Sequence, residues 1–261
     1  MSVVLTSISH ARSRDHWQGT LRILRFNWPF YVAGSAALLC AWVALVMLPL
    51  PTSIGIVLVA GATCATFWLI ASLVVSHLVY DRSDIRDCRW LAREPSIRPG
   101  RWINIHAGFD ETSVPLRRIF GGTGRTFDMF DARAMTERSI ARARRSSATT
   151  TDAEAVDFRK LPLRDRELDV ALLLLAAHEL RRHDDRVALF GELHRSLRVG
   201  GRVILAEHLR DPWNFLAFGP GFLHFLPRRA WLRAAEASHL SLEREFPITP
   251  FVRVFIFGRP S

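Results

Sequence analysis

Cysteine is scarce in this sequence, and the few cysteines are not spaced as a cluster. The 261 residues contain three: Cys40 and Cys64 lie in an apolar region, and Cys88 lies just beyond it. Because no CxxC pair occurs, the sequence suggests neither a zinc site nor a disulfide framework. Three reduced, unpaired thiols are typical of intracellular chains. No metal-binding residue is predicted.

Charged side chains are missing from one long stretch. No Asp, Glu, Lys or Arg occurs between Arg25 and Asp81. Two apolar runs, residues 28–50 and 52–80, fill this stretch, and each is long enough to cross a hydrocarbon core, which takes about 20 helical residues. The sequence therefore predicts a two-span transmembrane hairpin over residues 28–80. A signal peptide has a shorter apolar core, and a buried helix pair in a soluble protein is the other alternative.

Positive charge predominates in the rest of the chain, with a net charge of +10 that comes mainly from arginine. Arginines flank both sides of the predicted hairpin, whereas its connecting loop "LPLPTS" carries no charge. The positive-inside rule then places both ends in the cytoplasm. We expect a multi-pass protein of the cytoplasmic (inner) membrane, with a cytoplasmic N-terminal segment, 1–27, and a cytoplasmic domain, 81–261. The flanking residues are Arg12, Arg14, Arg22, Arg25, Arg82, Arg86, Arg89 and Arg93.

Beyond residue 80 the hydrophobic pattern alternates between strands and helices. Such alternation predicts an α/β domain with a doubly wound, Rossmann-like and mainly parallel sheet. In these sheets, ligands bind beyond the carboxyl ends of the strands. The predicted strands are "RWINIHAG", "RTFDMFD", "AVDF", the start of "LDVALLLLAAHEL", "RVILAEHL" and a terminal pair, "SLEREFPI" and "FVRVFIFG". The predicted helices are "DRSDIRDCRWLAR", "ETSVPLRRIFG", "TERSIARARR", "DDRVALFGELHRSLR" and "RRAWLRAAEASH".

The order of these motifs resembles that of the class I S-adenosylmethionine-dependent methyltransferases. The best-matching segment, 156–208, combines an acidic turn, an "LP" approach to the fourth strand, a histidine after that strand, and a helix that ends in "VGG" where the family has "PGG". The resemblance covers roughly residues 101–208, with a weaker tail to residue 261. It implies a cleft for S-adenosyl-L-methionine along the strand ends.

The resemblance implies that "WINIHAGFDET" is the cofactor loop. Gly108 matches the middle glycine of the family's GxGxG motif, while His106 and Asp110 stand where the flanking glycines usually are. Asn104 replaces a common acid. These departures leave two possibilities: either both side chains turn away from the cofactor, or they have been recruited for another purpose.

Two acids complete the cofactor site that the resemblance implies. An acid at the end of the second strand normally accepts the ribose hydroxyls. Asp131 is the best match, with Asp128 as an alternative in a different register. Two carboxylate oxygens can accept both O–H groups. Asp157, after the third strand, matches the acid near the adenine amine.

Histidines and acids that follow the fourth and fifth strands are candidate catalytic residues. His178 is the first candidate for a general base, because its ordinary pKa is suitable and it follows a central strand. Glu207 and His208 are second choices. The alternative for each is a structural role, in which the side chain caps a turn or bonds to neighbouring loops.

The segment 211–227 is rich in aromatic and apolar residues. In the family, this region usually forms part of the substrate lid, so we predict a hydrophobic substrate pocket that includes Trp213, Phe218, Phe222 and His224. Packing of these rings onto the hairpin is a near-equal alternative.

An arginine-rich helix adds a question about partners. Arg138, Arg142, Arg144 and Arg145 invite a nucleic-acid interpretation, but no interleaved aromatics or RNA-binding module accompany them. A solvated helix face is favoured, followed by contact with anionic lipid. We expect membrane lipid, and no nucleic acid, as a partner.

Taken together, these features predict a membrane-anchored methyltransferase that acts on a hydrophobic, membrane-resident small molecule such as a lipid or a quinone. Two alternatives stay open. One is an enzyme of the same fold that uses the cofactor differently, and the other is a non-catalytic membrane interaction protein.

Overall fold

The computed structural model describes residues 17–94, 97, 99–121, 124–146 and 152–260. Its centre is a seven-stranded sheet in the order β3-β2-β1-β4-β5-β7-β6, in which β7 runs antiparallel to both neighbours and strands β1 to β5 are parallel. The predicted doubly wound, mainly parallel α/β sheet is therefore confirmed. The strands are β1 (Trp102–His106), β2 (Arg125–Asp128), β3 (Ala153–Ala155), β4 (Leu168–Leu174), β5 (Leu197–His208), β6 (Ser241–Thr249) and β7 (Val252–Gly258).

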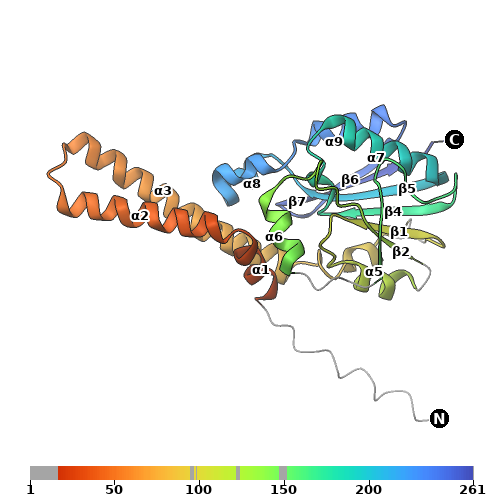
Figure 1. Ribbon diagram of the computed structural model, residues 1–261, viewed down its shortest axis with the longest axis horizontal. Coiled ribbons are helices and arrows are strands. Elements are labelled where there is room, and N and C mark those ends of the chain that lie inside the picture. Colours follow the sequence, from red (N-terminus) through yellow and green to blue (C-terminus); the bar gives the residue numbers. More distant parts are fainter. Residues whose placement is uncertain (1–16, 95–96, 98, 122–123, 147–151, 261) are drawn as a thin grey trace, which may run out of the picture.

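Helices cover both faces of the sheet (Figure 1). One core packs α7 (His183–Ser196) and α9 (Arg228–Ala237) against the sheet, through residues such as Phe190 and Trp231. The opposite core contains α4 (Arg89–Ala92), α5 (Ser113–Phe120) and α8 (Pro212–Phe218). Strand β4 is apolar except for Asp169, because it is sandwiched between these two layers.

Two long apolar helices project away from the sheet (Figure 1). They are α2 (Trp28–Met47) and α3 (Thr52–Ser76), and by length and composition each can cross a membrane. No residue of α2 is buried by the described part of the chain, and α3 is buried only near its end, at Ser72, Val75 and Ser76. This exposure differs from that of a core helix in a soluble protein.

The helix pair is joined firmly to the domain at its base. A π-helical turn, η1 (His77–Arg82), continues α3 and places Val79 in the same core as α4 and α5. The carboxylate of Asp81 accepts hydrogen bonds from the backbone N–H groups of Gly19 and Thr20, at the start of α1 (Gln18–Phe26). The start of α1 is thus anchored to the end of α3.

Some predicted elements differ from the observed ones. The helix expected over 81–93 is reduced to the four residues of α4, because Cys88 adopts a left-handed backbone conformation with φ of 55°. The expected strand "RTFDMFD" ends at Asp128. The "VGG" segment lies inside β5 rather than in a turn, because Leu197 already pairs with Leu168 of β4.

Candidate functional site

A cavity of about 720 Å³ lies beyond the carboxyl ends of the central strands. Its wall combines the loop after β1, the ends of β4 and β5, and helices α1 and α6 (Arg138–Ser146) with the bases of α2 and α3. The cavity therefore connects the edge of the sheet where ligands bind in this fold class to the two apolar helices. Lining residues include Phe30, Tyr31, Ser76, Phe109, His178 and Glu179.

His178 lies in this wall between two carboxylates. It lies in η2 (Ala177–Glu179), directly after β4, and its Nδ1 is 2.8 Å from Oε2 of the fully buried Glu207. Its Nε2 is 3.5 Å from Oε1 of Glu179. Burial alone would lower the pKa of His178, but the two carboxylates raise it to about 10. In this arrangement the imidazole holds its proton at neutral pH, so it can donate a proton but not accept one.

His208, at the end of β5, has a different environment. Its Nδ1–H donates to the carbonyl of Phe251 (2.9 Å), so its Nε2 accepts from the hydroxyl of Tyr80 (3.0 Å). Burial lowers the pKa of His208 to about 4, and the nearby His178 cation contributes to this shift. His208 is thus a neutral side chain that connects β5 to η1 at the base of α3. This link could not be predicted from the sequence, because Tyr80 and His208 are 128 positions apart.

The loop after β1 is stabilised by its own unusual residues. Gly108 has a φ of +85°, and its N–H donates to Nδ1 of His106 at 3.0 Å. One carboxylate oxygen of Asp110 accepts from the N–H groups of Thr112 and Ser113, which forms a side-chain-bonded turn directly before α5. The residues in the two glycine places have therefore been recruited to build the loop. Burial lowers the pKa of His106, whose Nε2 has no partner among the described residues.

Arg144 of α6 fills the space between this loop and β2. Its Nη1 donates to Oδ2 of Asp128 at 2.7 Å, and its guanidinium lies 4.1 Å from the ring centre of Phe130. A Cβ placed on Gly108 would lie only 1.8 Å from the same Nη1. Arg142 donates to the carbonyl of Phe26. The prediction of a solvated face is therefore wrong for Arg142 and Arg144. It holds for the exposed Arg145, and the side chain of Arg138 lies outside the described residues.

The two acids predicted to hold the cofactor lie outside the cavity wall. Asp131 follows the end of β2 by three residues and accepts hydrogen bonds from Arg133 N–H and Arg159. These bonds lower the pKa of Asp131, and the bond from the Arg133 N–H has the largest effect. Asp157 is mostly exposed, 3.8 Å from Arg159. The acid that ends β2 is Asp128, the alternative register of the sequence-based prediction.

The aromatic segment divides between the cavity and the helix pair. Phe218 and His224, the latter at the end of η3 (Gly219–His224), line the cavity. Phe222 packs against Phe215, whose ring centre lies 5.5 Å from that of Trp68 in α3. Trp213 is exposed. Packing onto the helix pair is therefore observed for Phe215, while Phe218 and His224 line the cavity, and their contact with a substrate stays a prediction.

Comparison with known proteins confirms the resemblance drawn from the motifs. Residues 122–205 match the family model described as "Methyltransferase domain". No curated protein matches the chain. A SAM-dependent methyltransferase from Aquifex aeolicus matches with a TM-score of 0.50 and 13% identity, over 67% of this chain and 91% of that one. This match shows a shared fold.

Two further solved structures are similar at slightly lower scores. A SAM-dependent methyltransferase from Methanosarcina mazei has a TM-score of 0.49 and 13% identity, covering 65% of this chain and 97% of its own. The geranyl diphosphate C-methyltransferase from Streptomyces coelicolor A3(2), in complex with Mg²⁺, geranyl diphosphate and S-adenosyl-L-homocysteine, has a TM-score of 0.49 and 15% identity, covering 72% and 82%.

Proposed function

We propose that this protein transfers a methyl group from S-adenosyl-L-methionine to a hydrophobic small molecule that resides in the membrane. The observation that carries this proposal is the composition of the cavity wall. One wall contains the loop after β1, the polar ends of β4 and β5, and the bases of α2 and α3. An acceptor that enters from the bilayer along these helices would meet the carboxyl edge of a methyltransferase-like sheet.

The helix pair is the proposed membrane anchor. Both helices have the length and hydropathy of membrane spans, and their apolar side chains are exposed along most of their length. Arginines lie on both sides of the pair, and none lies in its connecting loop. This asymmetry supports an orientation with the domain on the cytoplasmic side of the cytoplasmic membrane. Nucleic acid has no part in the proposal.

The residues around the loop fit the cofactor, on one condition. The Gly108 turn offers a backbone without a side chain, Asp128 offers two acceptor oxygens, and Asn104 Oδ1 and His106 Nε2 are buried without partners among the described residues. Arg144 must withdraw from this space, and its long side chain is one-third exposed. When bound, S-adenosyl-L-methionine supplies an activated methyl group.

The chain itself contributes enclosure and orientation. Methyl transfer mainly requires that the two reactants be positioned in line, because the cofactor carries a good leaving group. Apolar residues such as Phe30, Phe109 and Phe218 would hold the body of the acceptor and exclude water. The polar end at His178 and Glu179 would receive its reactive head.

Transfer of radiolabelled methyl groups to lipid extracts, with the protein in vesicles, tests this proposal. Gly221 lines the cavity, and a Cβ there would meet nothing closer than Phe218 Cβ at 3.9 Å. Gly221→Leu should therefore fold, narrow the cavity and abolish acceptor methylation while leaving cofactor binding intact. Gly191→Leu is the control, because it adds the same side chain on α7, where no atom lies within 4 Å. Equal activities of the two variants would exclude the cavity as the acceptor site.

The position of Arg144 against Gly108 favours one second candidate, a non-catalytic interaction protein whose cofactor space is permanently filled. Calorimetry with S-adenosyl-L-methionine on the detergent-solubilised protein separates the two. A folded protein that binds no cofactor would establish the second candidate. Binding without transfer to any lipid fraction would indicate an enzyme that uses the cofactor differently.

A further inference from the structure

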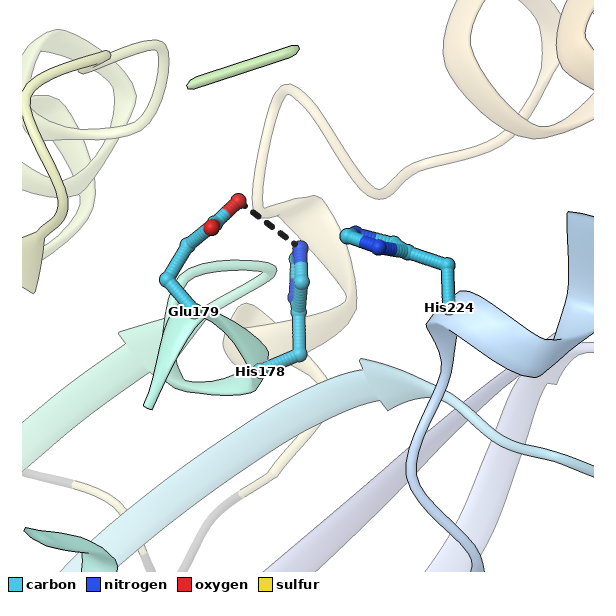
Figure 2. A group of neighbouring side chains, drawn as sticks. All are labelled: His178, Glu179 and His224. Carbon is cyan, nitrogen blue, oxygen red and sulfur yellow. Dashed lines mark ion pairs between the residues drawn. The ribbon is translucent and has the colours of Figure 1, made fainter. Parts of the chain in front are cut away.

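Three side chains in the cavity wall form a compact group that methyl transfer does not itself require. His178 and Glu179 come from η2, and His224 comes from the end of η3, more than forty residues later in the chain. Figure 2 shows the Glu179 carboxylate and the His224 ring on either side of the His178 ring. One nitrogen or oxygen atom from each residue lies within 4.8 Å of the other two. We call this group the His–Glu–His triad.

We infer that the His–Glu–His triad binds a divalent transition-metal ion, with zinc as the ion that fits its chemistry. Two imidazoles and one carboxylate form a donor set that suits zinc or iron, whereas magnesium prefers oxygen alone. In a tetrahedral zinc site the ligand atoms lie about 3.4 Å apart, since each is about 2.0–2.1 Å from the ion. His178 Nε2 and Glu179 Oε1 are already 3.5 Å apart. The third ligand atom, from His224, lies within 4.8 Å of its partners, so it would have to move by roughly 1 Å to reach the tetrahedral spacing.

Glu207 orients the first of these ligands. Its Oε2 accepts from His178 Nδ1 at 2.8 Å, and its Oε1 accepts from the His178 backbone N–H at 3.1 Å. These bonds fix the ring so that Nε2 faces the triad. A buried carboxylate that holds the far nitrogen of a ligating histidine is a common feature of protein zinc sites.

A second, independent observation concerns Glu179. Its side chain is 7% exposed, and its Oε2 has no hydrogen-bond partner in the part of the chain that the structure describes. Leaving a buried carboxylate oxygen without a partner is costly. A metal ion bound by both carboxylate oxygens of Glu179, together with His178 and His224, would satisfy this oxygen.

All three members of the triad line the cavity. An ion held by three protein ligands keeps a coordination position for an outside oxygen, as catalytic zinc sites do. Resting on the proposed function, this position would receive an oxygen of the acceptor and make its hydroxyl more acidic.

The inference is tested by titrating zinc into the full-length, tag-free protein in detergent, after a chelator has removed any bound metal. We expect elemental analysis to find one zinc per chain. Calorimetry measures the affinity for zinc, and Mg²⁺ should not compete with zinc for the site. Cobalt substitution should give the visible absorption bands of a four- or five-coordinate site. His224→Ala and Glu179→Gln should each weaken zinc binding by about tenfold or more, and Glu207→Gln by about 10–100-fold.

His194→Ala is the matched control, because His194 lies next to another histidine, His239, with ring centres 6.0 Å apart, and does not line the cavity. It should bind zinc like the wild type. Absence of zinc binding, or equal affinities of the His224→Ala and His194→Ala proteins, would overturn the inference. Thermal unfolding of each metal-free variant checks its fold. Glu179→Gln keeps the side-chain shape and carries the test alone if His224→Ala does not fold.

The same samples distinguish this inference from the proposed function. If the protein transfers methyl groups but does not bind zinc through the triad, the inferred metal site is overturned and the proposed methyltransferase function stands. If the protein binds zinc through the triad but binds no S-adenosyl-L-methionine, the inferred metal site stands and the proposed methyltransferase function is overturned.

Discussion

The two sides of the sheet's carboxyl edge hold their charged groups in opposite ways. On the β1–β2 side, Asp110 is bonded to backbone N–H groups and Asp128 to the partly exposed Arg144. On the β4–β5 side, Glu207 is fully buried against His178, and one oxygen of Glu179 has no partner among the described residues. The first side is closed by the protein's own groups, while the second is preformed and open to the cavity.

This difference indicates how the two halves would bind their ligands. A ligand on the β1–β2 side must displace Arg144 from a partly exposed ion pair with Asp128, which costs little to break. A ligand on the β4–β5 side meets buried charges whose positions are fixed by strands β4 and β5. Because buried charges are costly to rearrange, the fold fixes the positions of the charged groups on the β4–β5 side. On the β1–β2 side, a ligand and Arg144 would compete for Asp128.

Glu207→Ala should produce the largest effect, because it removes the buried partner of a histidine cation. Breaking a buried pair in this way costs about 3–5 kcal/mol of unfolding free energy. The control is Glu243→Ala, which removes the partner of Arg202 in a more exposed pair with a 2.7 Å separation and should cost less than about 1 kcal/mol. Chemical unfolding of the metal-free protein in detergent measures both. Equal losses would remove the contrast between buried and exposed charges.

Acid sensitivity of His208 tests the β4–β5 side from another direction. Its folded-state pKa of about 4 lies below the ordinary 6.5, so above pH 6.5 its contribution to stability is fully present. As the pH falls from 6.5 towards 4, the unfolded chain takes up a proton that the folded chain refuses, and about 3 kcal/mol is lost. His208→Gln keeps a donor and an acceptor but cannot titrate.

The thermal unfolding temperature of wild type should therefore fall more steeply between pH 7 and pH 5 than that of His208→Gln. His178, His224 and Tyr80 are present in both proteins, so the difference isolates residue 208. Identical slopes would mean that His208 is not held neutral by burial at the junction with the helix pair.

Asp128→Ala tests the other side of the edge and should have an intermediate effect. Loss of hydrogen bonds to a charged group should weaken the binding of S-adenosyl-L-methionine by about 1–3 kcal/mol. Asp131→Ala should have less effect, because Asp131 lies three residues beyond the end of β2 and bonds to Arg133 and Arg159. Calorimetry on both variants decides which of the two acids binds the cofactor. A larger loss of cofactor affinity in Asp131→Ala would favour Asp131, the first choice of the sequence-based prediction.

The fold was predictable because its determinants are local and periodic. The continuous apolar run of β4 and the alternation of strands with helices are visible in the sequence, and they predicted the mainly parallel sheet. The order of its seven strands was not predicted. The short form of α4 was not predictable, because it depends on the left-handed backbone of Cys88, which no residue preference indicates.

The candidate site was predictable only in part. The hydrophobic pattern locates strand ends, which made His178 and Glu207 candidates, whereas Gly108 was assigned from the resemblance to the methyltransferase family. The pairing of Tyr80 with His208 and of His224 with His178 depends on the packing of distant segments, which periodicity does not encode. Arg144 was assigned to a solvated face, since a basic helix gives no sign of which of its arginines reaches a loop.

Arg144→Met should have the smallest effect, and its sign is the most informative. If Arg144 competes with the cofactor for Asp128, removal of an ion pair worth about 0.5–1 kcal/mol should tighten cofactor binding by about two- to fivefold. Met keeps much of the chain that packs on Phe130 but loses the charge. Arg145→Met, on the next residue, which is exposed, is the control and should leave the affinity unchanged.

Calorimetry with S-adenosyl-L-methionine measures both variants under one salt concentration, because the affected charges are partly exposed and therefore screened. Weaker binding by Arg144→Met would show that Arg144 contacts the cofactor instead of excluding it. The β1–β2 side would then be a preformed site like the β4–β5 side, and the contrast between the two halves of the edge would be lost.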